Sequence, residues 1–262
     1  MKVLTWFSWG RKIFVILVYF IMPGITNYIF SMTNYNETAM SDKSNECVVL
    51  FHGLARSSRS FSAMENALSK VGYHVINIDY PSRKYTIEKL AENYVAKGIA
   101  ECSFARTEKI HFITHSMGGI IVRYYLMNHS LNNLGHVVML SPPNQGSEIV
   151  DKLGNFPGFF ALNGPAGQQL GTLPKSLPNK LGPVDYSVGV ITGNKSINLI
   201  LSTLIPGDDD GKVSVERAKV AGMSDYLVVP HTHPMIMSSK EVIRQTINYL
   251  QNGRFYRKTD TQ

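Results

Sequence analysis

The 262-residue sequence lacks the features that mark several classes of protein. It has no internal repeat and no low-complexity tract, and 44% of its residues are hydrophobic against 17% charged, which is an ordinary globular composition. Lysine and arginine are scattered singly rather than clustered, so the formal net charge of +7 indicates a solvated surface and no nucleic-acid partner. No spacing of histidine, cysteine and aspartate suggests a metal site, and we expect neither a metal nor a cofactor. The length suits one α/β domain with an appendage.

Cysteine is also scarce, because only Cys47 and Cys102 occur. Each stands upstream of a predicted strand, and those two strands are expected to be neighbours. An oxidising compartment would allow a disulfide between them, but spacing alone does not establish the geometry that a disulfide needs. A Cys47–Cys102 disulfide and two free thiols are therefore equal alternatives.

The N-terminal segment is the exception to the ordinary composition. Residues 13–22 form a continuous apolar run, and no charged residue appears until Glu37. A helix over residues 13–32 would measure about 30 Å, enough to cross the hydrocarbon core of a bilayer. Three basic residues precede it, so the positive-inside rule places the N-terminus in the cytoplasm. Residues 1–36 are thus predicted to be a transmembrane anchor, followed by a linker over 37–46.

A cleaved signal peptide is the alternative for this segment. Its apolar core would end near Pro23, but the residues that follow offer few small side chains for cleavage. Both interpretations place the rest of the chain outside the cytoplasm. The protein is therefore expected to be membrane-anchored, or periplasmic or secreted if the segment is removed.

Apolar, β-rich runs alternate with helical patterns from residue 47 onwards. Strands are expected at 47–51, 74–79, 110–114, 136–140, 188–192 and 226–229, and helices at 61–71, 86–100, 120–127, 197–204 and 241–250. This order predicts a mostly parallel sheet of about six strands with helices on both faces. We place the catalytic domain at 47–254, with a tail over 255–262. Ligands of such sheets bind beyond the carboxyl ends of the strands.

Ser116 is the most informative residue. It stands in Thr-His-Ser-Met-Gly-Gly, between an apolar run of strand type and a run of helix type. A strand, a tight turn and a helix with serine at the turn are typical of a nucleophile elbow. The pattern departs from Gly-x-Ser-x-Gly at its first position, where Thr114 replaces glycine. A serine hydroxyl needs a neighbouring base to become a nucleophile.

The base and its acidic partner are expected downstream of Ser116, in the order nucleophile, acid, histidine. His231 and His233 both follow the last strand, and we favour His233, with His231 as the alternative base. Among the three aspartates at 208–210, we expect at most one to point inward, because three adjacent carboxylates cannot all be buried as anions. Asp210 is preferred because Gly211 follows it. Alternative acids are Asp185 and Asp225.

An oxyanion formed at the serine needs two fixed donors. We assign the backbone N–H groups of Met117, directly after Ser116, and of Leu54, in the loop after the first strand. His52 and His115 are predicted to have structural roles. His52 ends a strand before a glycine, and His115 is expected to pack behind the elbow.

Five segments together resemble bacterial lipase-like α/β-hydrolases. They are VVLFHGLARSSRSF, THSMGGIIVRYYL, SPPNQGSEIVD, DDDGKVS and HTHPMIM. The resemblance implies an α/β-hydrolase fold in which Ser116, Asp210 and His233 form the catalytic triad. It also gives the oxyanion role to Leu54 through the His-Gly-Leu match.

The sequence therefore predicts a serine hydrolase that cleaves a carboxylic ester, such as a lipid or other acyl ester, through an acyl-enzyme. A segment rich in glycine, proline, leucine and phenylalanine at 154–183 is interpreted as a cap over the site or as an ordinary connection. Two rival functions remain. One is acyl transfer or thioester cleavage on the same fold, and the other is a non-catalytic, membrane-bound binding protein.

Overall fold

A parallel six-stranded sheet forms the centre of the protein. The computed structural model describes residues 43–257. The strands are β1 (Glu46–Phe51), β2 (His74–Ile78), β3 (Lys109–His115), β4 (Leu134–Leu140), β5 (Val188–Gly193) and β6 (Asp225–Val229). Their order in the sheet is β2-β1-β3-β4-β5-β6, and every neighbouring pair is parallel. The predicted strands and their parallel arrangement are confirmed.

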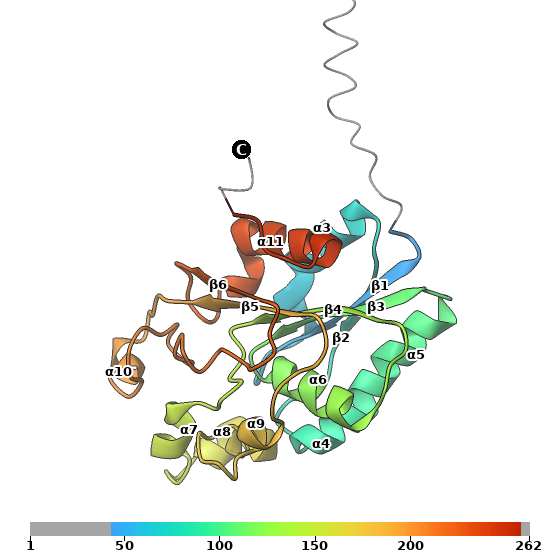
Figure 1. The fold of residues 1–262 in the computed structure, drawn as a ribbon. Coiled ribbons are helices and arrows are strands. Elements are labelled where there is room, and N and C mark those ends of the chain that lie inside the picture. Colours follow the sequence, from blue (N-terminus) through green and yellow to red (C-terminus); the bar gives the residue numbers. More distant parts are fainter. Residues whose placement is uncertain (1–42, 258–262) are drawn as a thin grey trace, which may run out of the picture. The chain divides into compact units, whose positions relative to one another are not determined.

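Helices cover both faces of the sheet (Figure 1). On one face lie α3 (Ser62–Val71), preceded by the 3-10 turn η1 (Ser58–Phe61), and the closing helix α11 (Lys240–Asn252), preceded by η3 (Ile236–Ser238). On the other face lie α4 (Ile87–Leu90), the π-helical turn η2 (Ala91–Val95), α5 (Ala96–Phe104) and α6 (Met117–Asn128). The remaining short helices are α7 (Glu148–Leu153), α8 (Phe159–Gln168), α9 (Leu177–Lys180) and α10 (Leu199–Ser202).

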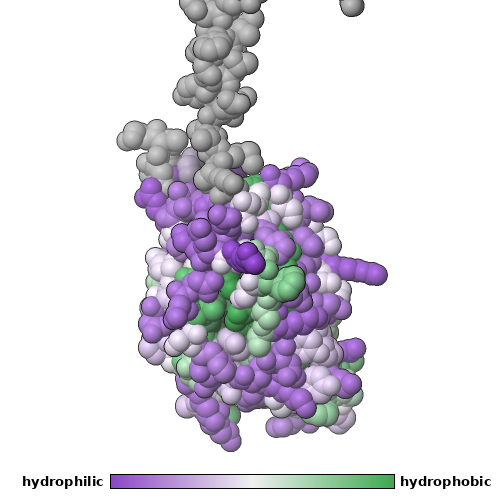
Figure 2. All heavy atoms as spheres, turned by 90° about the vertical axis from the view of Figure 1, so that its right-hand side faces the viewer, coloured by the Kyte–Doolittle hydropathy of each residue, from purple (hydrophilic) through white to green (hydrophobic). Residues whose placement is uncertain are grey.

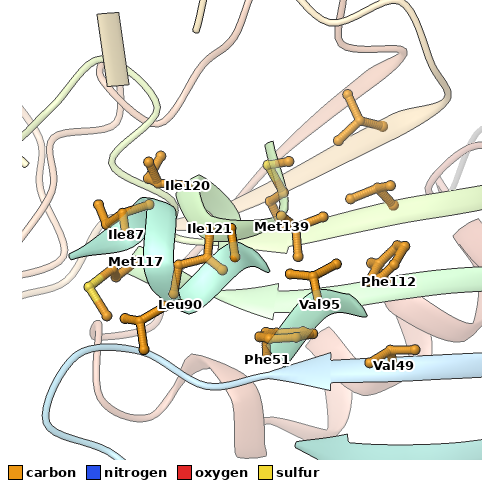
Figure 3. Packing of buried hydrophobic residues seen from close by; sticks show 14 of the residues in the cluster. Val49, Phe51, Ile87, Leu90, Val95, Phe112, Met117, Ile120, Ile121 and Met139 are labelled. Atoms are coloured by element: carbon orange, nitrogen blue, oxygen red, sulfur yellow. The ribbon is translucent and has the colours of Figure 1, made fainter. Parts of the chain in front are cut away.

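Each strand supplies side chains to two hydrophobic layers because alternate residues point to opposite faces. In β1, Val49 and Phe51 face α4–α6, whereas Val48 and Leu50 face α3 and α11. Figure 3 shows the first layer, where side chains of β1, β3, η2, α4 and α6 point toward one another. The core therefore holds the end of β3 and the start of α6 from both sides.

The strand order reverses between β1 and β3: the chain runs from β1 outward to β2 and then returns to the other side of β1 to form β3. The connection from β1 to β2 packs on one face, and the connection from β2 back to β3 packs on the other. Such a switch leaves a crevice at the carboxyl ends of the two central strands, which is where ligands bind in open α/β sheets. Figure 2 shows the side where β1 and β3 begin, and hydrophilic side chains cover most of it around a small apolar patch. The predicted site residues follow the other ends of the strands.

Cys47 of β1 and Cys102 of α5 form a disulfide, with their Cα atoms 5.8 Å apart. Both residues are completely buried. Of the two alternatives left open by the sequence, the disulfide is the one found. The disulfide links α5, the helix that leads to β3, to strand β1.

The C-terminal boundary of the domain lies beyond the predicted one. We assigned residues from 255 onwards to a tail, whereas Phe255 is fully buried and packs on Tyr249 with ring centroids 4.9 Å apart. Its backbone N–H donates to Asp225 Oδ2 at 2.7 Å. The folded domain therefore includes residues 255–257.

Within residues 43–257, no helix has the length and apolar character to cross a membrane. The predicted anchor at 1–36 lies outside the described residues.

Candidate active site

Ser116 occupies a sharp turn between β3 and α6. Its backbone angles are φ 53° and ψ −125°, in the left-handed half of conformational space that residues with a side chain rarely adopt. The Ser116 N–H donates to Leu140 O at 2.9 Å, and Ser116 O accepts from the N–H of Gly119 at 2.9 Å. Core packing before and after the turn thus holds a strained serine at the carboxyl end of the sheet, as the elbow pattern predicts.

Close backbone packing explains the glycines around the elbow. A Cβ atom on Gly118 would lie 2.5 Å from Phe51 O, so helix α6 approaches β1 more closely than any side chain permits. A Cβ atom on Gly119 would lie 3.2 Å from the Oγ1 atom of Thr114, the residue that departs from the usual elbow pattern. Thr114 is fully buried, and its hydroxyl has no hydrogen-bond partner within the described part of the chain. The elbow therefore forms with threonine at this position, but with an unsatisfied hydroxyl.

His233 and Asp210 form a buried hydrogen-bonded pair. His233 Nδ1 lies 2.8 Å from Asp210 Oδ2, and the His233 N–H donates to the Asp210 carbonyl oxygen at 2.9 Å. The other carboxylate oxygen of Asp210 accepts the N–H groups of Lys212 at 3.0 Å and Val213 at 2.9 Å. Burial alone would raise the pKa of Asp210, but the His233 ring and these hydrogen bonds hold that pKa below its ordinary value. The carboxylate is thus kept ionised and oriented toward His233 Nδ1.

The alternative base and acids have other partners. His231 Nε2 lies 2.8 Å from the Oγ atom of Ser239, the N-cap of α11, and His231 does not line the cavity beside Ser116. Asp225 binds Arg257, with Asp225 Oδ1 2.6 Å from Arg257 Nη2. Asp185 is exposed to solvent. None of the three is brought to Ser116.

One expectation about the acidic turn is wrong. We expected at most one of the three aspartates to point inward, but Asp209 is 8% exposed and Asp210 is fully buried. The two carboxylates are accommodated because each has its own donors. Asp209 Oδ1 accepts from Ser202 Oγ at 2.8 Å and from the Gly211 N–H at 2.6 Å. Asp209 therefore fastens α10 to the acid loop and leaves Asp210 to pair with His233.

His115 packs beside the base as well as behind the elbow. Its ring centroid lies 4.7 Å from that of His233, and His115 Nε2 lies 3.0 Å from the His233 carbonyl oxygen. Burial, and then the charge of His233, lower the pKa of His115 well below its ordinary value. A neutral His115 donates Nε2–H to the carbonyl and so holds the loop that carries His233.

The proposed oxyanion donors belong to two segments next to the serine. Met117 opens α6, so its N–H is among the first four of that helix, which have no partner within the helix. Leu54 lines the cavity with Ser116, and Gly53 lets its loop come so close that a Cβ atom there would lie 3.1 Å from Ser116 Cβ. Both segments thus lie beside Ser116, and the oxyanion role of their amides stays a prediction.

His52 has the structural role that we predicted. Its Nδ1 donates to Gly53 O at 2.9 Å, and its Nε2 accepts the N–H of Tyr80 at 3.4 Å. The ring stacks on Tyr80 with centroids 4.1 Å apart. Burial lowers the pKa of His52, in keeping with a neutral ring that joins β1 to the end of β2.

A cavity of about 650 Å³ brings the candidate residues together, and we call it the catalytic cavity. Ser116, Asp210, His233, His115 and Leu54 all line it. Its walls are mostly apolar and come from α7, α8, α10 and the loop before α10, with Val150, Leu153, Phe159, Leu162, Ile197 and Leu201 among them. The segment at 154–183 thus supplies part of the wall over the serine.

Sequence reasoning missed the basic residues of this cavity. Arg56 and Lys212 both line it. Arg56 follows the oxyanion candidate Leu54 by two positions, and Lys212 follows the Asp-Gly pair. Their place next to predicted site residues was the available signal. Within the described residues, no group of three or more histidines, cysteines or acidic residues could hold a metal ion.

Comparisons with known proteins agree with this architecture. Residues 48–233 match the alpha/beta hydrolase family. No curated protein matches the chain. Among solved structures, the mature lipase BlEst2 of Bacillus licheniformis is 20% identical with a TM-score of 0.60, over 79% of this chain and 91% of that one.

Two further structures have the same fold. Phospholipase PlaB from Legionella pneumophila is 21% identical with a TM-score of 0.54, over 66% of this chain and 45% of that one. A metagenomic carboxyl esterase is 19% identical with a TM-score of 0.56, over 72% of this chain and 65% of that one. At such identities, the likeness establishes the fold alone.

Proposed function

The chain belongs to the alpha/beta hydrolase family, and from this premise we propose that it is a serine hydrolase that cleaves carboxylic esters with an apolar acyl group. The fold by itself hosts many activities. Ester hydrolysis is therefore inferred from the site. Its main support is the Asp210–His233 pair in the cavity that Ser116 lines from a strained turn.

The proposed reaction has two steps. Ser116 Oγ attacks the ester carbonyl carbon while its proton passes to His233 Nε2, and the N–H groups of Leu54 and Met117 stabilise the oxyanion. His233 then gives the proton to the leaving alcohol, and an acyl-enzyme remains on Ser116. In the second step His233 takes a proton from water, the hydroxide attacks the acyl carbon, and the free acid leaves as Ser116 recovers its proton. Asp210 keeps the imidazole in the tautomer with hydrogen on Nδ1 and stabilises its charged form.

The apolar walls of the catalytic cavity favour an acyl chain over a polar group. A chain in contact with Val150, Leu153 and Phe159 loses water-exposed apolar surface, and burial contributes roughly 25 cal/mol per Å². Two of the apolar side chains that line the cavity are largely exposed, Leu162 at 66% and Ile197 at 75%. These features support a lipid or other acyl ester as substrate.

We further propose that the enzyme acts outside the cytoplasm, tethered by residues 1–36. The apolar run with basic residues before it supports the tether. The Cys47–Cys102 disulfide supports the location, because disulfides persist in oxidising compartments. Cell fractionation combined with N-terminal sequencing of the mature protein tests both points. Recovery of the full-length chain in the cytoplasm would contradict them.

A fluorophosphonate probe tests the proposed chemistry, because it reacts with an activated serine. We expect covalent labelling of the wild type, none of Ser116→Ala, and ester hydrolysis that depends on the same residue. Labelling that survives in Ser116→Ala would move the nucleophile elsewhere. An unlabelled wild type with native circular dichroism would refute a serine hydrolase.

The matched pair His233→Ala and His231→Ala tests the choice of base. We expect His233→Ala to lose labelling and hydrolysis, and His231→Ala to keep both. The opposite result would assign the base to His231. Transfer of the acyl group to an added alcohol in excess of the free acid would favour an acyltransferase.

A further inference from the structure

A second pocket adjoins the catalytic cavity, and we call it the basic pocket. Its volume is about 500 Å³, and it shares two lining residues, Ala55 and Arg56, with the catalytic cavity. The turn after β2 supplies Arg83 and Lys84, and helix α8 supplies Ala161. Three cationic side chains from two separate loops thus surround one pocket.

The acidic residues of the described part of the chain do not balance these charges. Among the described residues that line the basic pocket there is no aspartate or glutamate. Within residues 43–257, none of Arg56, Arg83 and Lys84 forms an ion pair with a carboxylate. Lys84 Nζ lies 5.4 Å from the ring centroid of Tyr85, a contact that attracts the ammonium group but adds no negative charge. The basic pocket therefore carries a net positive charge that an anionic ligand would neutralise.

The backbone beneath these cations is fixed. The Ala55 N–H donates to the Oγ atom of Ser82 at 3.0 Å, and this hydrogen bond joins the two loops that carry the basic side chains. Ser82 is 4% exposed, and the Lys84 N–H closes the turn by donating to Pro81 O at 2.9 Å. Such a preorganised frame lowers the entropy cost of binding.

The segment at 154–183, which we call the cap because it lines the catalytic cavity, also contacts this turn. Gly164 of α8 has φ 65°, and a Cβ atom there would lie 1.9 Å from Arg83 O. Only glycine permits so close an approach between the cap and the turn. The position of the basic pocket is thus set by β1, β2 and the cap together.

The catalytic cavity and the basic pocket differ in their walls. The catalytic cavity is mostly apolar, although Arg56 and Lys212 also line it, and Asp210, the only acidic residue among its described lining residues, is buried and paired with His233. Arg56 stands at the junction, in the loop of the oxyanion candidate Leu54. An ester at Ser116 therefore has the apolar catalytic cavity on one side, for its acyl group, and the basic pocket on the other, for its alcohol group.

We propose that the basic pocket binds an anionic group, a phosphate or a carboxylate, on the alcohol side of the ester. The planar guanidinium groups of Arg56 and Arg83 suit the bidentate hydrogen bonds that such oxygens accept, and Lys84 adds a point charge. The substrate class is then an anionic acyl ester. This inference rests on the proposed ester hydrolysis at Ser116, and it concerns only which esters are preferred.

Two monomeric substrates that differ in one group test the inference. They are the octanoyl ester of glycerol and the octanoyl ester of glycerol 3-phosphate, each used below the concentration at which it aggregates. We expect the wild type to hydrolyse the phosphorylated ester with a kcat/KM about tenfold higher, as one charge-assisted interaction provides. The preference should appear in KM, because the phosphate lies away from the reacting carbon.

The variant R83Q/K84Q should lose this preference, whereas K70Q/K240Q should keep it. The second variant also removes two positive charges, but from exposed positions on α3 and α11. A preference that falls equally in both variants would indicate steering by net charge alone and would overturn the inference. So would a wild type that does not prefer the phosphorylated ester.

Two further measurements separate the sources of the anion. Inorganic phosphate should compete with the phosphorylated ester in the wild type and much more weakly in R83Q/K84Q. A preference seen only when the ester is embedded in vesicles would point to a charged membrane surface and would overturn a group-specific pocket. Hydrolysis of the neutral ester that depends on Ser116 would still support the proposed function, so the two hypotheses fail separately.

Discussion

His233 Nδ1 lies 2.8 Å from Asp210 Oδ2, although 23 residues separate the two in the chain. The second oxygen of the carboxylate is occupied by the N–H groups of Lys212 and Val213. The carboxylate is thus fixed before it meets the histidine. This arrangement favours one orientation of the imidazole, with Nδ1–H donating to Asp210, and the proposed reaction then assigns Nε2 to the proton of Ser116.

Asp210→Asn should lower kcat by on the order of 10⁴-fold, the loss typical of a triad whose acid becomes an amide. The asparagine oxygen can keep the bonds to the Lys212 and Val213 N–H groups, which would turn its NH₂ group toward His233 and favour the wrong tautomer. The measurement is hydrolysis of a soluble p-nitrophenyl ester together with urea unfolding, to separate activity from stability.

Asp209→Asn is the matched control for this prediction. It makes the same change one residue away, at a carboxylate bonded to Ser202 and Gly211 rather than to a histidine. We expect kcat to fall less than about tenfold, because the catalytic geometry remains. Equal losses in the two variants would mean that the loop, and not the Asp210–His233 pair, determines activity.

Gly118→Ala should cost about 1–3 kcal/mol of stability and most of the activity. The added methyl group would lie 2.5 Å from Phe51 O and 2.8 Å from His52 O, and backbone atoms cannot move aside without displacing the elbow. Gly98→Ala in α5 is the control, since its methyl group would lie 2.6 Å from Val49 Cγ1, away from the site.

Both glycine variants are therefore expected to unfold at lower urea concentration than the wild type. Only Gly118→Ala should lose fluorophosphonate reactivity per folded molecule. Normal reactivity in folded Gly118→Ala would show that close packing of α6 on β1 is not what sets the position of Ser116.

The strands were predictable from the sequence because a parallel sheet buries both faces of each strand, and such strands are continuous apolar runs. The runs before Phe51, Ser116 and Ser141 are of this kind. The family order of nucleophile, acid and histidine then gave a testable set of site residues. Asp210 and His233 do lie within hydrogen-bond distance, although the sequence pattern alone could not predict that distance.

The cap was not predictable in the same way. Helix α9 in this segment has 4 residues and α8 is interrupted at Gly164, and α7 just before the segment has 6 residues. None is long enough to show a clear helical period. Asp209 was misjudged because its donor Ser202 belongs to another short helix. The basic pocket is formed by the loops after two strands and by the cap. These segments are far apart in the sequence, so no local sequence pattern predicts that they lie together.

Loss of the Cys47–Cys102 disulfide should destabilise the domain by about 2–5 kcal/mol. The bond spans 55 residues of sequence, and a cross-link over a long loop restricts the unfolded chain strongly. Thermal unfolding of the Cys47→Ala/Cys102→Ala variant, compared with the wild type, gives the change. A reducing agent should lower the unfolding temperature of the wild type and leave that of the variant unchanged. A wild type insensitive to the reductant would contradict a stabilising role.

The pH dependence of stability should have a contribution from His111, far from the catalytic cavity. His111 Nε2 donates to Glu46 Oε2 at 3.0 Å, and Nδ1 accepts the His136 N–H at 2.8 Å, so the folded state holds the neutral ring. Burial lowers the pKa of His111 to about 4, although Glu46 opposes the shift.

A histidine in the unfolded chain binds a proton below its ordinary pKa of about 6.5. Between pH 6.5 and 4 the unfolded state therefore binds more protons than the folded one, and stability falls as the pH is lowered through this window. The lowered pKa of His111 predicts a loss of about 2 kcal/mol between pH 7 and pH 5. Urea unfolding at the two pH values, for the wild type and His111→Gln, measures it. The variant is expected to be less stable at pH 7 but less sensitive to the change in pH, and an undiminished pH sensitivity would assign the effect to the other buried histidines.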